Sequence, residues 1–96
     1  MIEKILNDAV ALWGQRTQSM ILIEEMAELT QAIIKQQRES DVFSFTPNML
    51  EEMVDVTIML TQMTQTLTAK ESEEFVRLFY QKIRRLNRRI EEEKAR

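Results

Sequence analysis

Two short acidic strings are the part of this sequence best suited to chemistry. They share the form acid-acid-x-x-acid, lie 27 residues apart and read Glu24-Glu25-x-x-Glu28 and Glu51-Glu52-x-x-Asp55. At about 100° per residue of helix, the second and third acids of each string lie within roughly 60° of each other. Apolar residues flank both pairs on their helices. We therefore predict that Glu25, Glu28, Glu52 and Asp55 point toward the protein interior.

Four inward carboxylates need a compensating cation. Like charges at i,i+3 repel each other, and a buried carboxylate without a partner costs several kcal/mol. Oxygen ligands of this kind suit Mg²⁺ or Mn²⁺, and protein-bound Mg²⁺ usually completes its shell with water and substrate phosphates. The acids therefore predict a magnesium site, with manganese as the alternative ion, and a phosphorylated ligand. A solvated acidic face is the competing interpretation for either string alone.

The residue types that are missing narrow the chemistry further. The 96 residues include no cysteine and no histidine. This composition excludes disulfide scaffolds, thiol nucleophiles, cysteine-ligated zinc or iron–sulfur sites, histidine general bases and zincin motifs. Any reaction must use carboxylates, amides, hydroxyls, lysine or arginine.

The elements that would position the acids are helices. The chain is 44% apolar and 30% charged, with one glycine and one proline, and its apolar residues recur at steps of three and four. Gly14 would end the first helix, and Thr46-Pro47 would begin the third. The predicted helices span about 2–13, 15–38, 47–67 and 72–94. We expect one all-α domain over residues 1–96, a four-helix bundle in which the second and third helices form a central antiparallel pair carrying the acidic motifs.

Charge is unevenly distributed along the chain. Residues 77–96 carry eight basic residues and three acids, whereas residues 1–76 carry five basic residues and thirteen acids. Lys82 and Arg85 border the apolar stripe of the fourth helix, whose predicted buried residues are Phe75, Val76, Phe79, Ile83, Leu86 and Ile90. The pI of about 5.0 and the lack of a recognisable nucleic-acid-binding motif argue against nucleic acid as a partner. No run of residues is long and uncharged enough for a bilayer, so we expect no membrane partner and a cytoplasmic location.

Taken together, these residues resemble the MazG-like all-α nucleoside triphosphate pyrophosphohydrolases of the small single-domain type. The likeness rests on Glu25-x-x-Glu28, a gap of 23 residues and Glu52-x-x-Asp55, and extends to Trp13-Gly14, Gln18 and the basic last helix. It implies Mg²⁺-dependent cleavage of a nucleoside triphosphate between its α and β phosphates, with Glu25, Glu28, Glu52 and Asp55 as metal ligands. A homodimer or homotetramer is expected from this likeness and from the apolar surface that so small a subunit leaves uncovered.

Further roles are assigned to residues around the acids. Glu24 or Glu51 would orient or deprotonate the attacking water, and the sequence does not choose between them. The predicted substrate-binding residues are Trp13 and Gln18 for the base and Lys35, Lys82 and Arg85 for phosphates. Core packing is the alternative for Trp13. The alternative for Lys35 is an exposed lysine near a helix C-terminus, where the helix dipole favours a positive charge.

Two other functions remain open at this point. Phosphoribosyl-ATP pyrophosphohydrolase shares the helical carboxylate arrangement. A non-catalytic helical oligomeric interaction module, docking through its basic last helix, belongs to a different class. A melting temperature that rises with Mg²⁺ would separate a true metal site from such a module.

Overall fold

The chain forms four α-helices and no strand, which confirms the predicted all-α class. A computed structural model describes all 96 residues. The helices are α1 (Ile2–Trp13), α2 (Gln15–Glu39), α3 (Pro47–Gln65) and α4 (Ala69–Lys94). No helix combines the length and the apolar character that a bilayer crossing requires. The chain divides into two compact units, Met1–Thr66 and Leu67–Arg96.

Gly14 separates α1 from α2, as its position in the sequence predicts. Its φ of 89° lies in the left-handed region that favours glycine, and its N–H donates to the carbonyl of Val10 at 2.7 Å. The same residue precedes the first turn of α2, because the carbonyl of Gly14 accepts from the N–H of Gln18. One glycine therefore ends α1 and allows α2 to leave in a new direction.

The start of α3 also follows its predicted signal. Thr46 has extended backbone angles, and its Oγ1 accepts a hydrogen bond from the N–H of Met49 at 3.1 Å. Pro47 occupies the first turn, where a missing N–H costs nothing. Gln36, near the end of α2, donates to the carbonyl of Val42 at 2.8 Å and so fastens the connection to its helix. These contacts fix the start of α3, the helix that carries the second acidic string.

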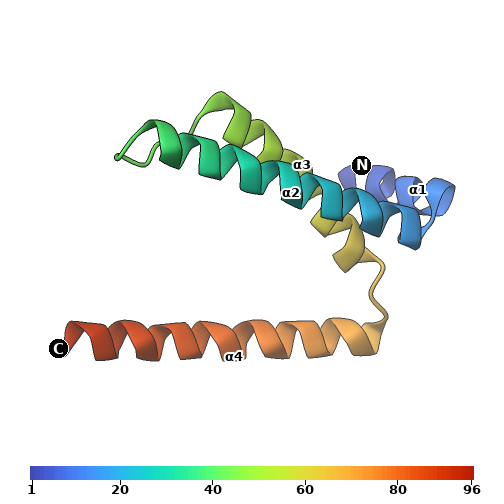
Figure 1. Ribbon diagram of the computed structural model, residues 1–96. Coiled ribbons are helices and arrows are strands. Elements are labelled where there is room, and N and C mark those ends of the chain that lie inside the picture. The colour runs from blue at the N-terminus through green and yellow to red at the C-terminus, as the bar shows by residue number, and fades with distance from the viewer. The chain divides into compact units, whose positions relative to one another are not determined.

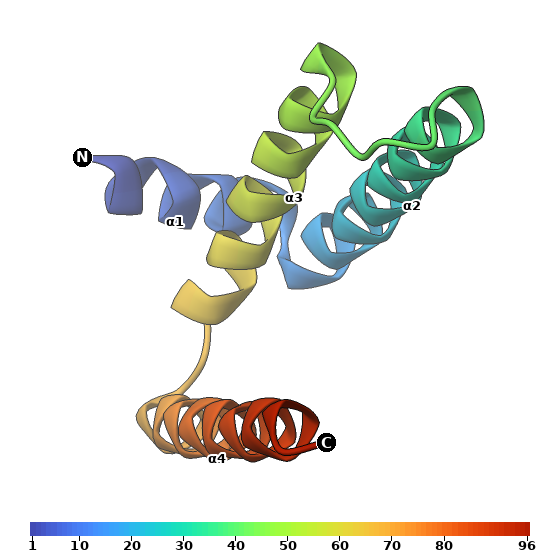
Figure 2. The same ribbon diagram turned by 90° about the vertical axis from the view of Figure 1, so that its left-hand side faces the viewer.

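In the first unit, α2 and α3 run antiparallel and side by side, and α1 packs against both (Figure 1; Figure 2). The interface between α2 and α3 holds most of the small core. Its buried apolar residues are Leu22, Ala32, Met49 and Met59, joined by Leu6 of α1. Three glutamines are buried as well, which is unusual for so small a core: Gln18, Gln36 and Gln62. The first unit therefore packs around a pair of helices whose shared face is partly polar.

The second unit is the single helix α4, which starts three residues earlier than the predicted Ser72. Thr68 and Glu71 form a capping box: the Thr68 side chain accepts from the Glu71 N–H, and the Glu71 carboxylate accepts from the Thr68 N–H. This reciprocal cap satisfies two N–H groups and moves the helix start back to Ala69. Taken by itself, the unit buries none of its side chains. The burial expected for Phe75, Val76, Phe79, Ile83, Leu86 and Ile90 is thus not found within it.

Candidate metal centre

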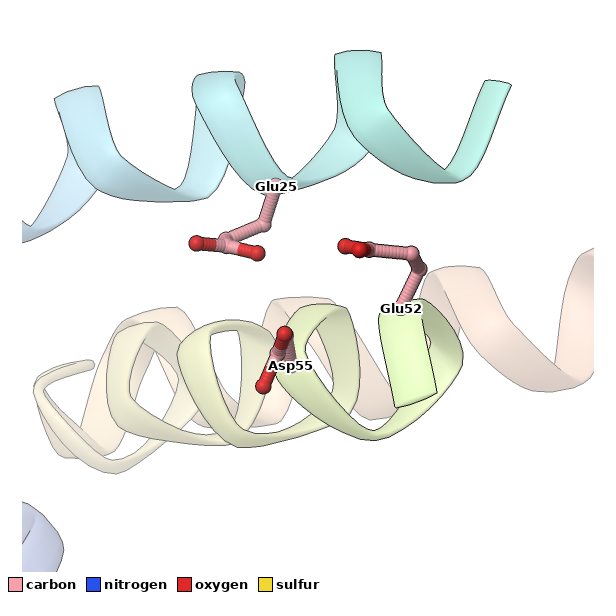
Figure 3. A group of neighbouring side chains, drawn as sticks. All are labelled: Glu25, Glu52 and Asp55. Atoms are coloured by element: carbon pink, nitrogen blue, oxygen red, sulfur yellow. The ribbon is translucent and has the colours of Figure 1, made fainter. Parts of the chain in front are cut away.

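Three of the predicted carboxylates meet between α2 and α3. Glu25 extends from α2 toward α3, and Glu52 and Asp55 extend from α3 toward α2 (Figure 3). One oxygen from each of the three residues lies within 4.8 Å of the others. All three side chains are half-buried. The structure therefore brings together acids that are up to 30 positions apart in the sequence.

Helix geometry and antiparallel packing explain why the acids meet. Residues at i and i+3 lie on the same side of a helix, so each string presents its second and third acids together. Glu25 lies next to Asp55, and Glu28 lies next to Glu52. The residue numbers in both pairs add to 80, as expected for two helices running in opposite directions at a fixed offset. The two acidic strings, which form an internal repeat with a spacing of 27 residues, thus place two pairs of acids opposite each other.

Two oxygen atoms at this site lack any hydrogen-bond partner. They are Oε2 of Glu25 and Oε2 of Glu52, and both are shielded from solvent. A shielded carboxylate oxygen without a donor is costly, because it has lost water and gained nothing in exchange. None of the four acids forms a salt bridge, since the ion pairs of the protein are Lys4–Asp8, Glu74–Arg77 and Glu93–Arg96. The site therefore has negative charge and unpartnered carboxylate oxygens, and no basic side chain forms an ion pair with them.

The pKa values of two acids reflect this surplus of negative charge. Burial raises the pKa of Glu25 above its ordinary value, and the nearby carboxylates of Glu28 and Asp55 raise it further. Burial also raises the pKa of Glu52, with Glu28, Asp55 and Glu25 adding to the shift. In both cases desolvation disfavours the charged form, and the neighbouring like charges act in the same direction. A bound cation would reverse this preference, because it favours the ionised ligands.

Glu28 lies at the margin of the site. Its side chain is exposed, and its carboxylate does not belong to the set of three that lies within 4.8 Å. It nevertheless lies close enough to Glu25 and Glu52 to raise the pKa of both. The predicted set of four ligands is therefore arranged as a central triad with one neighbouring carboxylate at its open edge.

The other predicted site residues are spread more widely. Glu24 and Glu51 are exposed on α2 and α3, each beside a residue of the triad. Trp13 is 58% exposed at the end of α1. Lys35 is exposed on α2, two turns beyond Glu28. Lys82 and Arg85 are exposed on α4 and belong to the second unit.

Gln18 is the predicted substrate-binding residue with the most constrained surroundings. Its side chain is only 5% exposed, and its Nε2 donates to Oε1 of Gln62 at 2.7 Å. Gln62 itself is 4% exposed and was not singled out from the sequence. A signal for it does exist, because Gln62 follows Asp55 by seven residues and Gln18 precedes Glu25 by seven. In an antiparallel pair, these offsets place the two glutamines opposite each other.

The arrangement of oxygens fits a hard divalent cation. Three carboxylates on two helices, two of them with free and shielded oxygens, form a ligand set of oxygen only. Mg²⁺ and Mn²⁺ prefer such ligands, and Mg²⁺ commonly keeps several water or phosphate oxygens beside a few carboxylates. Because Glu28 is exposed, water or phosphate oxygens can reach the triad from its side.

Comparison of the chain with protein-family models, with curated proteins and with solved structures finds no match.

Proposed function

We propose that the protein is a Mg²⁺-dependent nucleoside triphosphate pyrophosphohydrolase with the small, single-domain MazG-like arrangement. The observation that carries the proposal is the triad of Glu25, Glu52 and Asp55, whose oxygens lie within 4.8 Å and include two shielded atoms without a partner. A ligand set of this kind suits a cation that also binds phosphate oxygens. The resemblance of the paired motifs to MazG-like enzymes supports a nucleoside triphosphate as the phosphorylated ligand.

In this proposal, the triad holds the metal, and Glu28 supplies a further carboxylate at the edge. Bound Mg²⁺ would supply Lewis acidity, which polarises phosphoryl oxygens and offsets the charge of the leaving pyrophosphate. Manganese has the same ligand preference and would substitute for it. The role of the protein is then to fix the carboxylates on two rigid helices, so that their positions do not depend on a loop.

The reaction that follows is hydrolysis at the α phosphorus. A water oxygen forms a bond to that phosphorus, the bond to the bridging oxygen breaks, and the nucleoside monophosphate and pyrophosphate separate. Glu24 or Glu51 accepts the proton of the water, since both are exposed carboxylates beside the triad. Their symmetrical positions in the repeat leave either residue able to serve as this base.

Residues for the remainder of the substrate lie outside the triad. Lys35 is exposed on the helix that carries Glu25 and offers a phosphate contact. The exposed ring of Trp13 offers a stacking surface for a base. Lys82 and Arg85 belong to the second unit, and their role as phosphate contacts stays a prediction from the sequence. Gln18 fits a substrate role less well than these residues, because its amide N–H₂ is already committed to Gln62 in the core.

Self-association forms part of the proposal. Along α4, apolar residues recur at alternating steps of three and four, and each is between 42% and 54% exposed: Val76, Phe79, Ile83, Leu86 and Ile90. This spacing is typical of a helix that packs along one seam against another helix, and these five residues are called the α4 seam below. The first unit also leaves large apolar side chains at least half exposed, among them Ile23, Leu50 and Leu60. A homodimer or homotetramer would cover both surfaces.

The seam of α4 also favours a second candidate, a non-catalytic oligomeric interaction module. Within the enzyme class, phosphoribosyl-ATP pyrophosphohydrolase is the alternative, because the same carboxylates would serve its reaction. The carboxylates distinguish an enzyme from an interaction module. An interaction module has no use for four carboxylates that repel one another around shielded oxygens.

The deciding experiment is a panel of ribo- and deoxynucleoside triphosphates, with phosphoribosyl-ATP included, assayed for pyrophosphate in Mg²⁺ and in excess chelator. We expect pyrophosphate and a nucleoside monophosphate in Mg²⁺ and neither product in chelator. Release of orthophosphate would reject the proposed bond cleavage. Hydrolysis of phosphoribosyl-ATP alone would favour the alternative enzyme, and no hydrolysis of any substrate would favour the interaction module.

A further inference from the structure

The buried glutamine pair, Gln18 of α2 and Gln62 of α3, has no role in the function proposed so far. The two side chains are 5% and 4% exposed and share one hydrogen bond of 2.7 Å. Oε1 of Gln18 is shielded from solvent and has no partner of its own. A single amide–amide hydrogen bond contributes only about 1 kcal/mol, and two apolar residues of similar size would serve the core at least as well. Stability therefore does not explain the pair.

The register of the two helices offers an explanation. The numbers of Gln18 and Gln62 add to 80, the same sum that relates Glu25 to Asp55 and Glu28 to Glu52. The glutamine pair thus lies on the same antiparallel register as both acid pairs, two helical turns away along the interface. Whatever fixes the glutamines opposite each other also fixes the acids opposite each other.

Apolar packing alone does not fix this register. Along α2, the facing positions 18, 22, 25, 29 and 32 recur at steps of four and three, so a slip of seven residues restores the same spacing. Such a slip would set Glu25 against Gln62 and Asp55 against Ala32, and the triad would be lost. It would also place Gln18 beyond the last residue of α3, Gln65, so the hydrogen bond between Gln18 and Gln62 would be lost.

The two ends of the interface differ in how they are held. At one end, residues 40–46 connect the helices, and Gln36 fastens this connection through the carbonyl of Val42. At the other end, where α2 begins and α3 ends, no short connection joins the pair. The hydrogen bond between Gln18 and Gln62 lies at this open end.

We propose that Gln18 and Gln62 are positioning residues that hold the α2–α3 register and thereby set the affinity of the carboxylate site for its metal. They act through the helices and do not touch the ion. A buried polar pair that selects one helix register at little gain in stability is a known use of such groups. The link to metal affinity rests on the proposed metal site, whereas the link to register stands apart from it.

The first test replaces the pair with apolar residues. In the double variant Gln18→Leu/Gln62→Leu, we expect the melting temperature of the metal-free protein to be unchanged or higher. The Mg²⁺ concentration that gives half of the full rise in melting temperature should increase at least tenfold. The matched control is Leu22→Met/Met59→Leu, which exchanges similar volumes in the neighbouring buried layer and should leave the Mg²⁺ response of the parent unchanged.

The second test measures the register without metal. Because the chain has no cysteine, Thr30→Cys and Thr57→Cys provide the only two attachment points for nitroxide labels, both on exposed positions. Double electron–electron resonance measures the distance between the two labels, and dilution with unlabelled chains removes distances between subunits. The parent should give one narrow distance distribution. In the Gln18→Leu/Gln62→Leu background, we expect a broadened distribution or a second distance.

Each result bears on a different part of the proposal. An unchanged distance distribution overturns the role in register, whatever Mg²⁺ does. A changed distribution with an unchanged Mg²⁺ response, in a protein whose parent responds, overturns the link to the site. A parent with no Mg²⁺ response rejects the proposed function instead, and the label distances still decide the register.

Discussion

Carboxylate oxygens of Glu25 and Asp55 lie within 4.8 Å of each other, although the two residues belong to different helices that run in opposite directions. Neither residue forms a salt bridge, and one oxygen of Glu25 is shielded without a donor. Two like charges at this separation oppose the folded state unless a cation or a proton lies between them.

The first prediction concerns stability with and without metal. Replacing Glu52 with glutamine keeps its shape and removes one negative charge, so the metal-free Glu52→Gln variant should melt at the same temperature as the parent or a few degrees higher. Its Mg²⁺ affinity should fall by about tenfold or more, because a ligand is lost. Glu39→Gln, an exposed acid at the end of α2, is the control. A lower metal-free melting temperature with the parent's Mg²⁺ response would make Glu52 a structural carboxylate.

The second prediction concerns catalysis. Glu25→Gln and Asp55→Asn should each lower the rate of pyrophosphate release on the order of 100-fold or more, since each removes a charged ligand of the triad. Glu28→Gln should have a smaller effect, because Glu28 lies at the exposed edge. Steady-state assays with a fixed triphosphate and varied Mg²⁺ measure these effects. Equal losses in all three variants would contradict the division into a triad and a neighbouring acid.

The third prediction concerns pH. The pKa values of Glu25 and Glu52 are raised above their ordinary value of 4.5, so the folded chain holds more protons than the unfolded chain just above pH 4.5. The stability that this contributes is complete below 4.5 and is lost as pH rises through the raised values. As the pH rises above 4.5 and through the raised pKa values, the metal-free protein should therefore lose stability, and Mg²⁺ binding should strengthen as the carboxylates ionise.

The control for this pH dependence is the double variant Glu25→Gln/Glu52→Gln, which lacks both titrating groups. Melting in excess chelator should show a flatter pH profile for this variant than for the parent. A parent profile that is already as flat as that of the variant would show that the two carboxylates are fully ionised without metal.

The fourth prediction concerns assembly. Sedimentation equilibrium should show a dimer or a larger species at micromolar concentration, because α4 and the first unit both expose apolar side chains. Ile83→Gln places an amide in the α4 seam and should weaken association by about tenfold or more. Arg84→Gln, on the neighbouring exposed position, should not. A parent protein that sediments as a monomer would contradict the predicted oligomer.

Local signals explain which parts of the fold could be predicted. Gly14 and Thr46-Pro47 mark helix boundaries through their own backbone preferences, and both boundaries are confirmed. The predicted start of α4 at Ser72 is three residues too late, although the capping box of Thr68 and Glu71 is an equally local signal. The cluster of acids followed from the helical period and the repeat. Contacts between helices carry no such local signal: the burial of Gln62 follows only when the seven-residue offsets of Gln18 and Gln62 from the acids are combined with antiparallel packing, and nothing local marks the α4 seam as uncovered.

The internal repeat is imperfect at one position that matters for the site. Glu25 corresponds to Glu52 in the repeat, but Glu28 corresponds to Asp55, whose side chain is one methylene shorter. The triad includes Asp55 and leaves Glu28 at the exposed edge. Two otherwise equivalent helices thus present a short acid on one side and a long one on the other. The equivalence of the two halves of the repeat is broken at the carboxylate site, and an asymmetric molecule bound there would fit in one orientation better than in its reverse.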